Sequence, residues 1–293
     1  MHTAPNNERE LEVNHLLTGR RRGGGSDSGS EPLPELVVAG PETLFQVTDL
    51  RFEGPTARAS MPVVPEISGP GGAVSAGSLG VLVDVALGYA LVAGRPPGHW
   101  SVSTEICVEA LAGLSSAHRC LHAEATVLDV DALGGLARGA VFDDAGRLVA
   151  VCSQRGRFVP LADGSGDKPA DSLPPSVDIT GLTELIGTRV QAHLPGLQLA
   201  VARAVINPSG NLHGGIALCA SDVAAHVATG ELERQWITTS IQVSYVRPVP
   251  EDVDIVFEAR FCHRGRGLAV ADVVGSVTGK ACTIARVTLQ PGG

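Results

Sequence analysis

Apolar positions along the chain show two different periodicities, one typical of helices and one of strands, and these recur in the same order in each half. Helical spacing, with apolar residues three and four positions apart, runs through residues 79–90 and again through 216–227. Strand-like segments follow each helical stretch, at 101–111, 118–130, 133–143 and 146–159 in the first half and at 236–247, 252–264, 267–278 and 280–290 in the second. Extended segments precede the helices at Gln46–Met61 and Leu197–Val205, and another helix is expected at Ile179–Ala192. The pattern predicts an α+β fold in which an antiparallel sheet wraps around a long central helix, built twice.

Two polar stretches divide the chain into its expected parts. Residues 1–32 are charged and rich in Gly and Ser, so they cannot bury enough apolar surface to order themselves. Residues 161–176 have a similar composition, which is typical of an interdomain linker. The expected domains are therefore 33–160 and 177–291, which we predict to pack together as an internal pseudo-dimer, with further homo-oligomer formation possible but not required.

Composition excludes several classes of function. The net charge of −9 argues against a nucleic-acid partner, which favours a basic surface. No apolar run reaches the length of a membrane span, and the polar N-terminus shows no secretory signal, so we expect a cytoplasmic protein. The six cysteines lack metal-type spacing and the nine histidines form no ligand cluster, so buried free thiols and no metal are expected.

The most informative feature is a glycine-rich turn at the start of both expected helices. Residues 207–222 have a degraded copy at 69–84, which lies 138 positions upstream. The residues shared at this offset are Pro70 and Pro208, Gly72 and Gly210, Gly77 and Gly215, and Asp84 and Asp222. A repeat of this length indicates two copies of one domain.

The chemistry of this turn favours an anion site. His213, Gly214 and Gly215 stand where the chain enters the helix, whose first N–H groups lack intrahelical partners and carry the positive end of the helix dipole. Such amides can hold a thioester oxygen as it gains negative charge, and glycine allows its close approach. Asn207 can donate a side-chain N–H to the same region. His213 either contacts substrate or hydrogen-bonds to its own backbone, and Asp222 is costly in apolar company unless it is used or paired.

The second half resembles the hotdog-fold thioesterases of the phenylacetate-pathway (PaaI-like) type. The resemblance rests on the pattern Asn-x5-His-Gly-Gly-x6-Asp, followed by a Thr/Ser-bearing strand that ends at Tyr245–Pro248. It implies that the aspartate is a general base or nucleophile toward an acyl-CoA, with no separate cofactor, and that the amide after the histidine polarises the carbonyl. The residues implied in the second half are Asn207, His213, Gly214, Gly215, Asp222 and Thr238, and the first half retains Asp84 and Ser103. The first half departs from the pattern at Gly69, Ser75, Ala76 and Ala110.

Helix geometry decides which of these residues can act together. Gly214 and Asp222 are eight positions apart, so one helix separates them by about 12 Å. The carboxylate that acts at each oxyanion turn must therefore come from the helix of the other half. One composite site pairs Asn207, His213 and Gly214 with Asp84 and Ser103, and the other pairs the degraded turn with Asp222 and Thr238.

We therefore expect hydrolysis of an acyl-CoA thioester, with Asp84 acting on a carbonyl held at Gly214. Two alternatives stay open. A hotdog dehydratase would require a His/Asp acid–base pair on one catalytic loop, which the sequence does not show. A non-catalytic acyl-CoA-binding or scaffold protein is favoured by the substitutions in the first half.

Overall fold

A computed structural model describes residues 40–53, 55–67, 73–111, 114–115, 119–160, 181–190, 196–230 and 236–292. The segment 1–32 and the linker 161–176 lie outside the described residues, so the predictions made for them stay predictions. Residues 36–293 form one compact unit, which contains both halves of the repeat.

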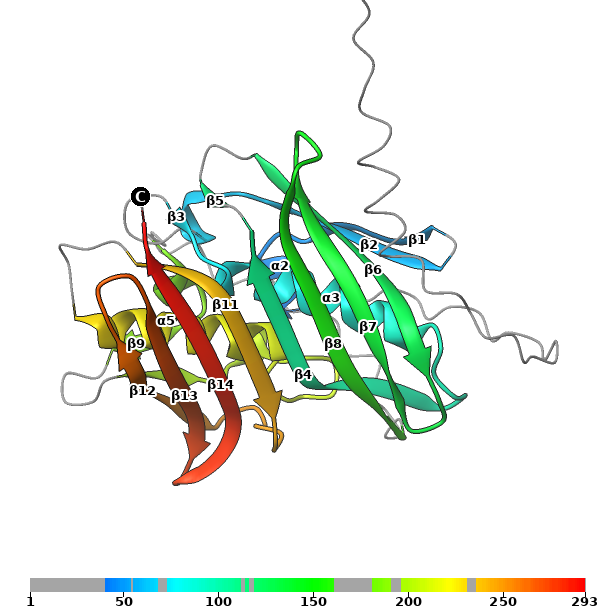
Figure 1. The fold of residues 1–293 in the computed structure, drawn as a ribbon. Coiled ribbons are helices and arrows are strands. Elements are labelled where there is room, and N and C mark those ends of the chain that lie inside the picture. The colour runs from blue at the N-terminus through cyan, green and yellow to red at the C-terminus, as the bar shows by residue number, and fades with distance from the viewer. Residues whose placement is uncertain are drawn as a thin grey trace, which may run out of the picture. The chain divides into compact units, whose positions relative to one another are not determined.

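The two halves contain matching series of helices and strands (Figure 1). The first half comprises α2 (Gly40–Leu44), β1 (Thr48–Glu53), β2 (Thr56–Pro62), η1 (Pro65–Ile67), β3 (Ala73–Val74), η3 (Gly77–Leu79), α3 (Gly80–Val92), β4 (His99–Ala110), β5 (Leu114–Ser115), β6 (Cys120–Val130), β7 (Gly134–Asp143) and β8 (Leu148–Pro160). The second comprises α4 (Leu182–Leu185), β9 (Thr188–Val190), β10 (Gly196–Ala200), η4 (Arg203–Val205), α5 (Gly214–Thr229), β11 (Trp236–Tyr245), β12 (Asp254–Arg264), β13 (Ala269–Val277) and β14 (Lys280–Pro291).

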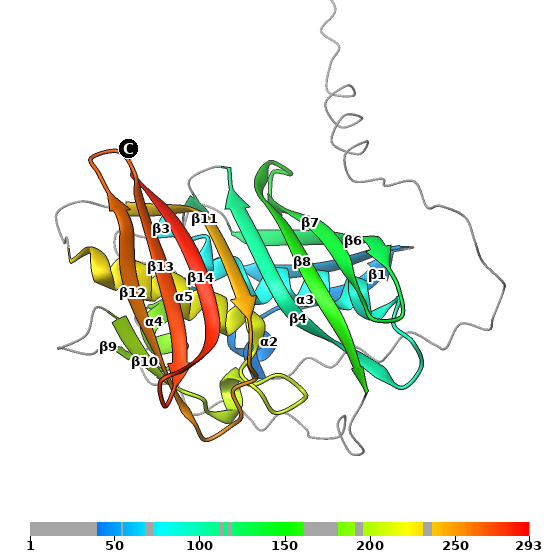
Figure 2. The ribbon, with the colours of Figure 1, turned by 60° about the horizontal axis from the view of Figure 1, so that its bottom comes forward.

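One antiparallel sheet joins the two halves. Its 12 strands follow the order β1-β2-β6-β7-β8-β4-β11-β14-β13-β12-β10-β9, so the order in the second half mirrors the order in the first (Figures 1 and 2). The junction is the pairing of β4 with β11, in which Val108 lies opposite Ile241. Backbone hydrogen bonds therefore run without interruption from one half into the other.

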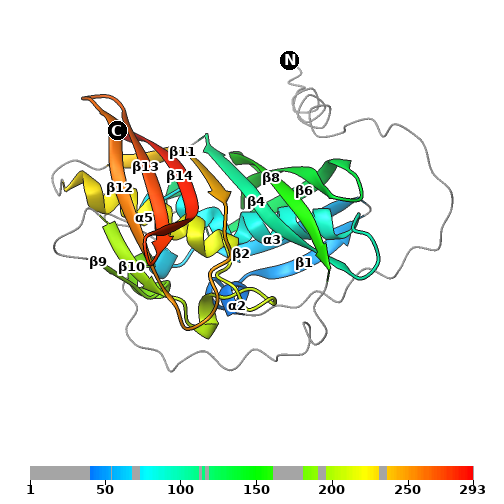
Figure 3. The same ribbon diagram turned by 90° about the horizontal axis from the view of Figure 1, so that it is seen from below.

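The two long helices lie on the same face of the sheet and pack against each other (Figure 3). The start of α5 meets the start of α3 at a pair of glycines. A Cβ atom added to Gly80 would lie 2.4 Å from the carbonyl oxygen of Gly215, and one added to Gly215 would lie 2.5 Å from the oxygen of Gly80. Both positions must therefore be glycine for the helix starts to touch. Helix α3 is buried on nearly every side, rather than on one face as its spacing predicted, because the sheet wraps around it and α5 covers it.

Three local predictions need correction. The expected extended segment Leu197–Val205 is extended only to the end of β10 at Ala200 and then forms the short 3-10 helix η4. The expected helix at Ile179–Ala192 is limited in the described residues to Leu182–Leu185 and gives way to strand β9, because Gly187 takes a positive φ of 71° that ends the helix. The expected extended segment Gln46–Met61 is a hairpin of two strands, β1 and β2.

The structure also bears on the thiols and on membrane spans. All six cysteines are free, but only Cys152, Cys219 and Cys282 are buried. Cys107 and Cys120 are partly buried and Cys262 is exposed, so the prediction of buried thiols is wrong at these three positions. Within the described residues, no helix has the length and apolar character that crossing a membrane requires.

Candidate active site

The start of α5 is organised by His213. This residue is the N-cap of the helix, and its Nδ1 accepts a hydrogen bond of 3.1 Å from the Gly215 amide. The ring therefore bonds to its own backbone, which was one of the two roles open for it, and it also lines the cavity described below. Gly214 is the first helical residue, so its N–H precedes the first intrahelical donor and is placed at the positive end of the helix.

Asp84 reaches this turn from the other half of the chain. Its Oδ2 accepts a hydrogen bond of 2.9 Å from the Gly215 amide, and its Oδ1 accepts one of 2.9 Å from the Ser103 hydroxyl. Gly214 lies against the same carboxylate, since an added Cβ would be 2.7 Å from Asp84 Oδ2. The structure thus brings together Asp84, Ser103, His213 and the two glycines, drawn from both helices. Gly215, expected at the substrate, uses its single N–H on Asp84 and His213 instead.

Two further side chains hold this arrangement in place. Gln154 on β8 donates a hydrogen bond of 2.9 Å from Nε2 to Ser103 Oγ, which fixes the hydroxyl that donates to Asp84. Tyr245 at the end of β11 donates to the carbonyl of Gly214 at 2.8 Å. Burial and the nearby Asp84 charge raise the pKa of Tyr245 well above its ordinary value, so the phenol remains a donor. Sequence reasoning noted Tyr245 only as part of a motif and missed Gln154, whose contact depends on strand pairing.

A second carboxylate faces the His213 ring. Glu42 on α2 is buried, and its Oε1 lies 3.5 Å from His213 Nε2, while Nδ1 lies 3.3 Å from Asp84 Oδ2. Burial lowers the pKa of His213, but the charge of Asp84 and the hydrogen bond and charge of Glu42 outweigh it, so the pKa lies above its ordinary value. When the ring is protonated, Nδ1 donates to Asp84 and can no longer accept from Gly215. No sequence signal connects Glu42 to this site, because 171 positions separate it from His213.

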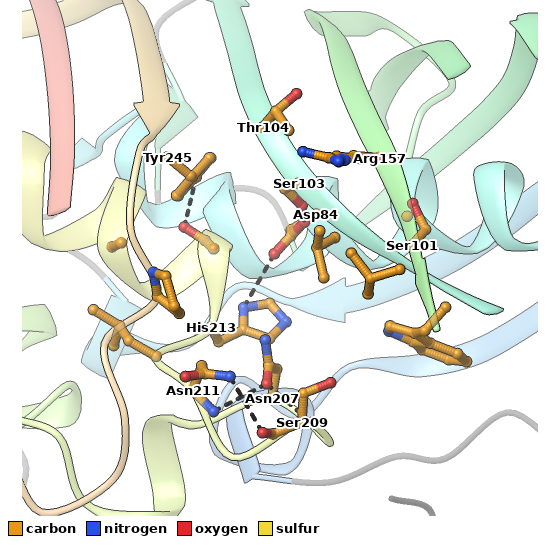
Figure 4. A pocket seen from close by; sticks show the side chains of 18 of the residues that line it. Asp84, Ser101, Ser103, Thr104, Arg157, Asn207, Ser209, Asn211, His213 and Tyr245 are labelled. Carbon is orange, nitrogen blue, oxygen red and sulfur yellow. Dashed lines mark hydrogen bonds and ion pairs between the residues drawn. The ribbon is translucent and has the colours of Figure 1, made fainter. Parts of the chain in front are cut away.

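These residues line a cavity of about 590 Å³ between the two halves. Figure 4 shows Asp84 and His213 in contact with each other at the cavity wall, with Ser103 beside the carboxylate and Asn207 below the ring. Asn207 also lines the cavity, but its Oδ1 accepts from the amides of Ser209 at 3.0 Å and Asn211 at 3.2 Å and so closes a tight loop. The predicted amide donor is therefore at the cavity wall, oriented by its own loop.

The other two predicted residues form a separate cluster. Thr238 donates to Asp222 Oδ1 at 2.6 Å, and the Nε2 of His226 lies 2.9 Å from the Thr238 hydroxyl oxygen. Asp222 is 1% exposed, and its Oδ2 has no hydrogen-bond partner in the part of the chain that the structure describes. Gly77 closes over it, since an added Cβ would lie 2.6 Å from that oxygen. The position that matches Asn207, Gly69, lies outside the described residues. No group of three or more His, Cys, Asp or Glu residues suited to a metal ion occurs among the described residues.

Comparisons with known proteins agree with this geometry. Residues 209–277 match the family model described as the thioesterase superfamily. The fold is similar to the tesB protein of Mycobacterium avium subs. paratuberculosis (TM-score 0.60, 12% identity, 86% of this chain and 100% of the other) and to a putative thioesterase II from Thermobifida fusca (TM-score 0.58, 15% identity, 88% and 100%). It is also similar to a 12:0-ACP thioesterase from Umbellularia californica (TM-score 0.56, 12% identity, 82% and 95%). No curated protein matches the sequence.

The fold is therefore the hotdog fold of these solved thioesterases, which agrees with the hotdog thioesterase resemblance found in the sequence. The match to the thioesterase superfamily model covers residues 209–277, which include the start of α5.

Proposed function

We propose that the chain is a tandem double hotdog that hydrolyses acyl-CoA thioesters at the composite site of Asp84 and Gly214. The observation that carries the proposal is the meeting of two half-sites. The Asp84 carboxylate of α3 lies 2.9 Å from the amide at the start of α5, and the two helices come from different halves of the repeat. The mirrored strand order supports the view that the halves take the places of two subunits in a dimer.

The site can promote hydrolysis through groups already in position. A thioester carbonyl held at the Gly214 amide would be polarised by that N–H and by the dipole of α5. Asp84, oriented by Ser103 and Gly215, takes a proton from water, whose oxygen then bonds to the carbonyl carbon. When the tetrahedral intermediate collapses, the C–S bond breaks and the proton passes to the departing sulfur. In the alternative route, an Asp84 oxygen attacks the carbon directly, and the C–S bond breaks to release the thiolate and leave an anhydride on Asp84. Water then hydrolyses the anhydride, which restores the Asp84 carboxylate and yields the carboxylic acid, and the thiolate takes up a proton from solvent.

The edge of the cavity favours a phosphate-bearing thioester. Arg157 and Arg247 line the cavity and are exposed, in a chain whose net charge is −9. Guanidinium groups suit the phosphates of coenzyme A. An acyl carrier protein presents the same thioester on a phosphopantetheine arm, so both carriers belong in the assay.

The test is thiol release by the purified chain from a series of acyl-CoA and acyl-carrier-protein substrates. We expect turnover of acyl-CoA by the wild type and a large loss in Asp84→Asn. Turnover of acyl-carrier-protein alone would correct the substrate, and absence of any hydrolysis would contradict the proposal.

A non-catalytic acyl-CoA-binding protein is the second candidate. The observation in its favour is that both oxygens of Asp84 already accept hydrogen bonds from the protein. Saturable binding of acyl-CoA with no thiol release would establish this candidate instead.

A further inference from the structure

Helices α3 and α5 differ at the position one helical turn after their matching aspartates, Asp84 and Asp222. Four residues after Asp84 comes Gly88, and four residues after Asp222 comes His226. Residues separated by four positions lie on the same helix face, so each of these positions is next to its carboxylate. Gly88 and His226 therefore occupy equivalent places beside the two aspartates.

At Asp222 the imidazole occupies this place. The Thr238 hydroxyl gives its proton to Asp222, so the bond of 2.9 Å between the ring and Thr238 is donated by Nε2 of His226. The hydroxyl–carboxylate pair in the second half is thus completed by a side chain from the helix itself.

At Asp84 the same hydroxyl–carboxylate pair is completed from another direction. Ser103 receives its second hydrogen bond from Gln154, which belongs to a strand and not to the helix. The residue at position 88 is therefore not needed as a hydrogen-bond donor to the hydroxyl, as His226 is in the second half. Gly88 is also the one residue of α3 that is not buried. A Cβ atom added at Gly88 would meet only Gln154 Nε2, at 3.6 Å, so the space beside the helix is open.

The cavity extends through this open space along α3. Val92 lies eight residues beyond Asp84, which is about 12 Å along the helix axis. The branch beyond Asp84 is lined by Val85, Gly88, Tyr89, Val92, Trp100 and Val102. The Tyr89 and Trp100 rings meet edge to face with centroids 6.4 Å apart. The side chains of these residues are hydrocarbon apart from the phenol and indole polar atoms, while Gln154 and Ser101 add polar groups to the cavity lining on the strand side.

We propose that Gly88 admits the acyl group of the substrate into this branch, and that His226 excludes an acyl group from the matching place in the second half. This inference rests on the proposed function for its substrate. It makes Gly88 a specificity-determining position and predicts one acyl site per chain. The Tyr89–Trp100 pair then limits the length of the acyl group.

The first experiment measures kcat/KM for acetyl-, butyryl-, octanoyl- and palmitoyl-CoA with three variants. In Gly88→Leu, the added side chain fills the branch, so kcat/KM should fall by roughly 100-fold for octanoyl-CoA and by a much smaller factor for acetyl-CoA. Gly88→Ala should give a smaller shift in the same direction. Trp100→Ala should move the preference toward longer chains. If Gly88→Leu moves the chain-length preference toward shorter acyl groups and Trp100→Ala moves it toward longer ones, loss of folding cannot explain both changes. An equal loss at all chain lengths, or no change, would overturn the inference.

The second experiment needs no turnover. Calorimetry with a non-hydrolysable thioether analogue of octanoyl-CoA should give one site per wild-type chain and much weaker binding by Gly88→Leu. Two sites per chain, or unchanged binding by Gly88→Leu, would overturn the inference. If the wild type binds one analogue but hydrolyses none of the thioesters, the acyl site stands and the proposed hydrolysis fails.

Discussion

Asp84 and Asp222 occupy matching positions on α3 and α5, yet their surroundings differ in the features that decide reactivity. Asp84 is 9% exposed, borders a cavity and faces an intact turn of His213 and two glycines. Asp222 is 1% exposed, bonds to Thr238 and lies beneath Gly77. In the proposed site, the intact-looking motif of the second half supplies the oxyanion turn, while the degraded first half supplies the carboxylate that this turn meets. Motif matching within one half would propose Asp222 instead of Asp84.

The sharpest test of this contrast is the pair Asp84→Asn and Asp222→Asn. Loss of a general base typically costs about 10²–10⁴ in rate. We expect Asp84→Asn to show a loss of that size in kcat/KM for acyl-CoA and Asp222→Asn to remain close to wild type, with both variants folded as judged by circular dichroism. The reverse order of activities would contradict the assignment of the site across the two halves.

The comparison between the two aspartates can also be tested at the glycines that lie against them, Gly214 at Asp84 and Gly77 at Asp222. A methyl group at Gly214 would press on Asp84 Oδ2, so Gly214→Ala should lower kcat/KM by roughly 10²-fold through displacement of the carboxylate. A methyl group at Gly77 would lie 2.3 Å from Asp222 Cβ, so Gly77→Ala should instead reduce the free energy of unfolding by about 1–3 kcal/mol. Thiol release and urea denaturation measure the two effects. Loss of activity in Gly77→Ala without loss of stability would show that the second half also carries a working site.

The buried His213 gives the turn beside Asp84 a pH-dependent contribution to stability. Because its pKa is raised in the folded state, protonation of the ring stabilises the fold fully below the ordinary value of 6.5, and this stabilisation is lost as the pH rises through the raised pKa. His213→Asn retains a good N-cap but cannot be protonated. We expect the difference in free energy of unfolding between the wild type and this variant to be larger at pH 5.5 than at pH 9, as measured by urea denaturation at the two pH values.

Glu42→Gln provides the control for that prediction, since it removes one of the two carboxylates that favour the protonated ring. It should reduce the difference between the two pH values. If His213→Asn follows the wild-type pH profile throughout, the ring is not protonated between its two carboxylates.

The smallest effect is expected at Tyr245, whose counterpart in the repeat is Ala110. Tyr245→Phe removes the hydrogen bond to the Gly214 carbonyl and should lower the free energy of unfolding by about 1 kcal/mol, with a several-fold loss of kcat. Thermal denaturation and steady-state kinetics measure these changes. A larger effect on kcat than that of Asp84→Asn would make Tyr245 a direct participant.

Local patterns in the sequence were sufficient for the two long helices, α3 and α5, and for most strands. The strand predicted at 118–130 is observed at Cys120–Val130, and the one at 280–290 at Lys280–Pro291. These segments alternate or repeat at their own period, so tertiary contacts were not needed to identify them. The helix expected at Ile179–Ala192 failed because a glycine in the left-handed region ended it, which periodicity does not reveal.

The residues of the site can be divided in the same way, into those that the sequence predicts and those that depend on tertiary contacts. The 138-residue repeat and the rise of an α-helix are sufficient to predict that Asp84 lies against the turn of the second half. Glu42 and Gln154 could not be found in that way, because neither belongs to the repeat motif. Their contacts depend on the position of α2 beneath His213 and on the pairing of β4 with β8.

The continuous sheet across β4 and β11 has a further consequence for how such a molecule can diverge. An assembly of two identical chains must carry every substitution on both sides of its symmetry axis. Here the two halves of the sheet are formed by different parts of one chain, so each half can change independently. A glycine that opens space in one half (Gly88) and a histidine that fills the matching space in the other (His226) can therefore coexist. One half is then free to specialise in holding a reactant while the other specialises in holding the structure.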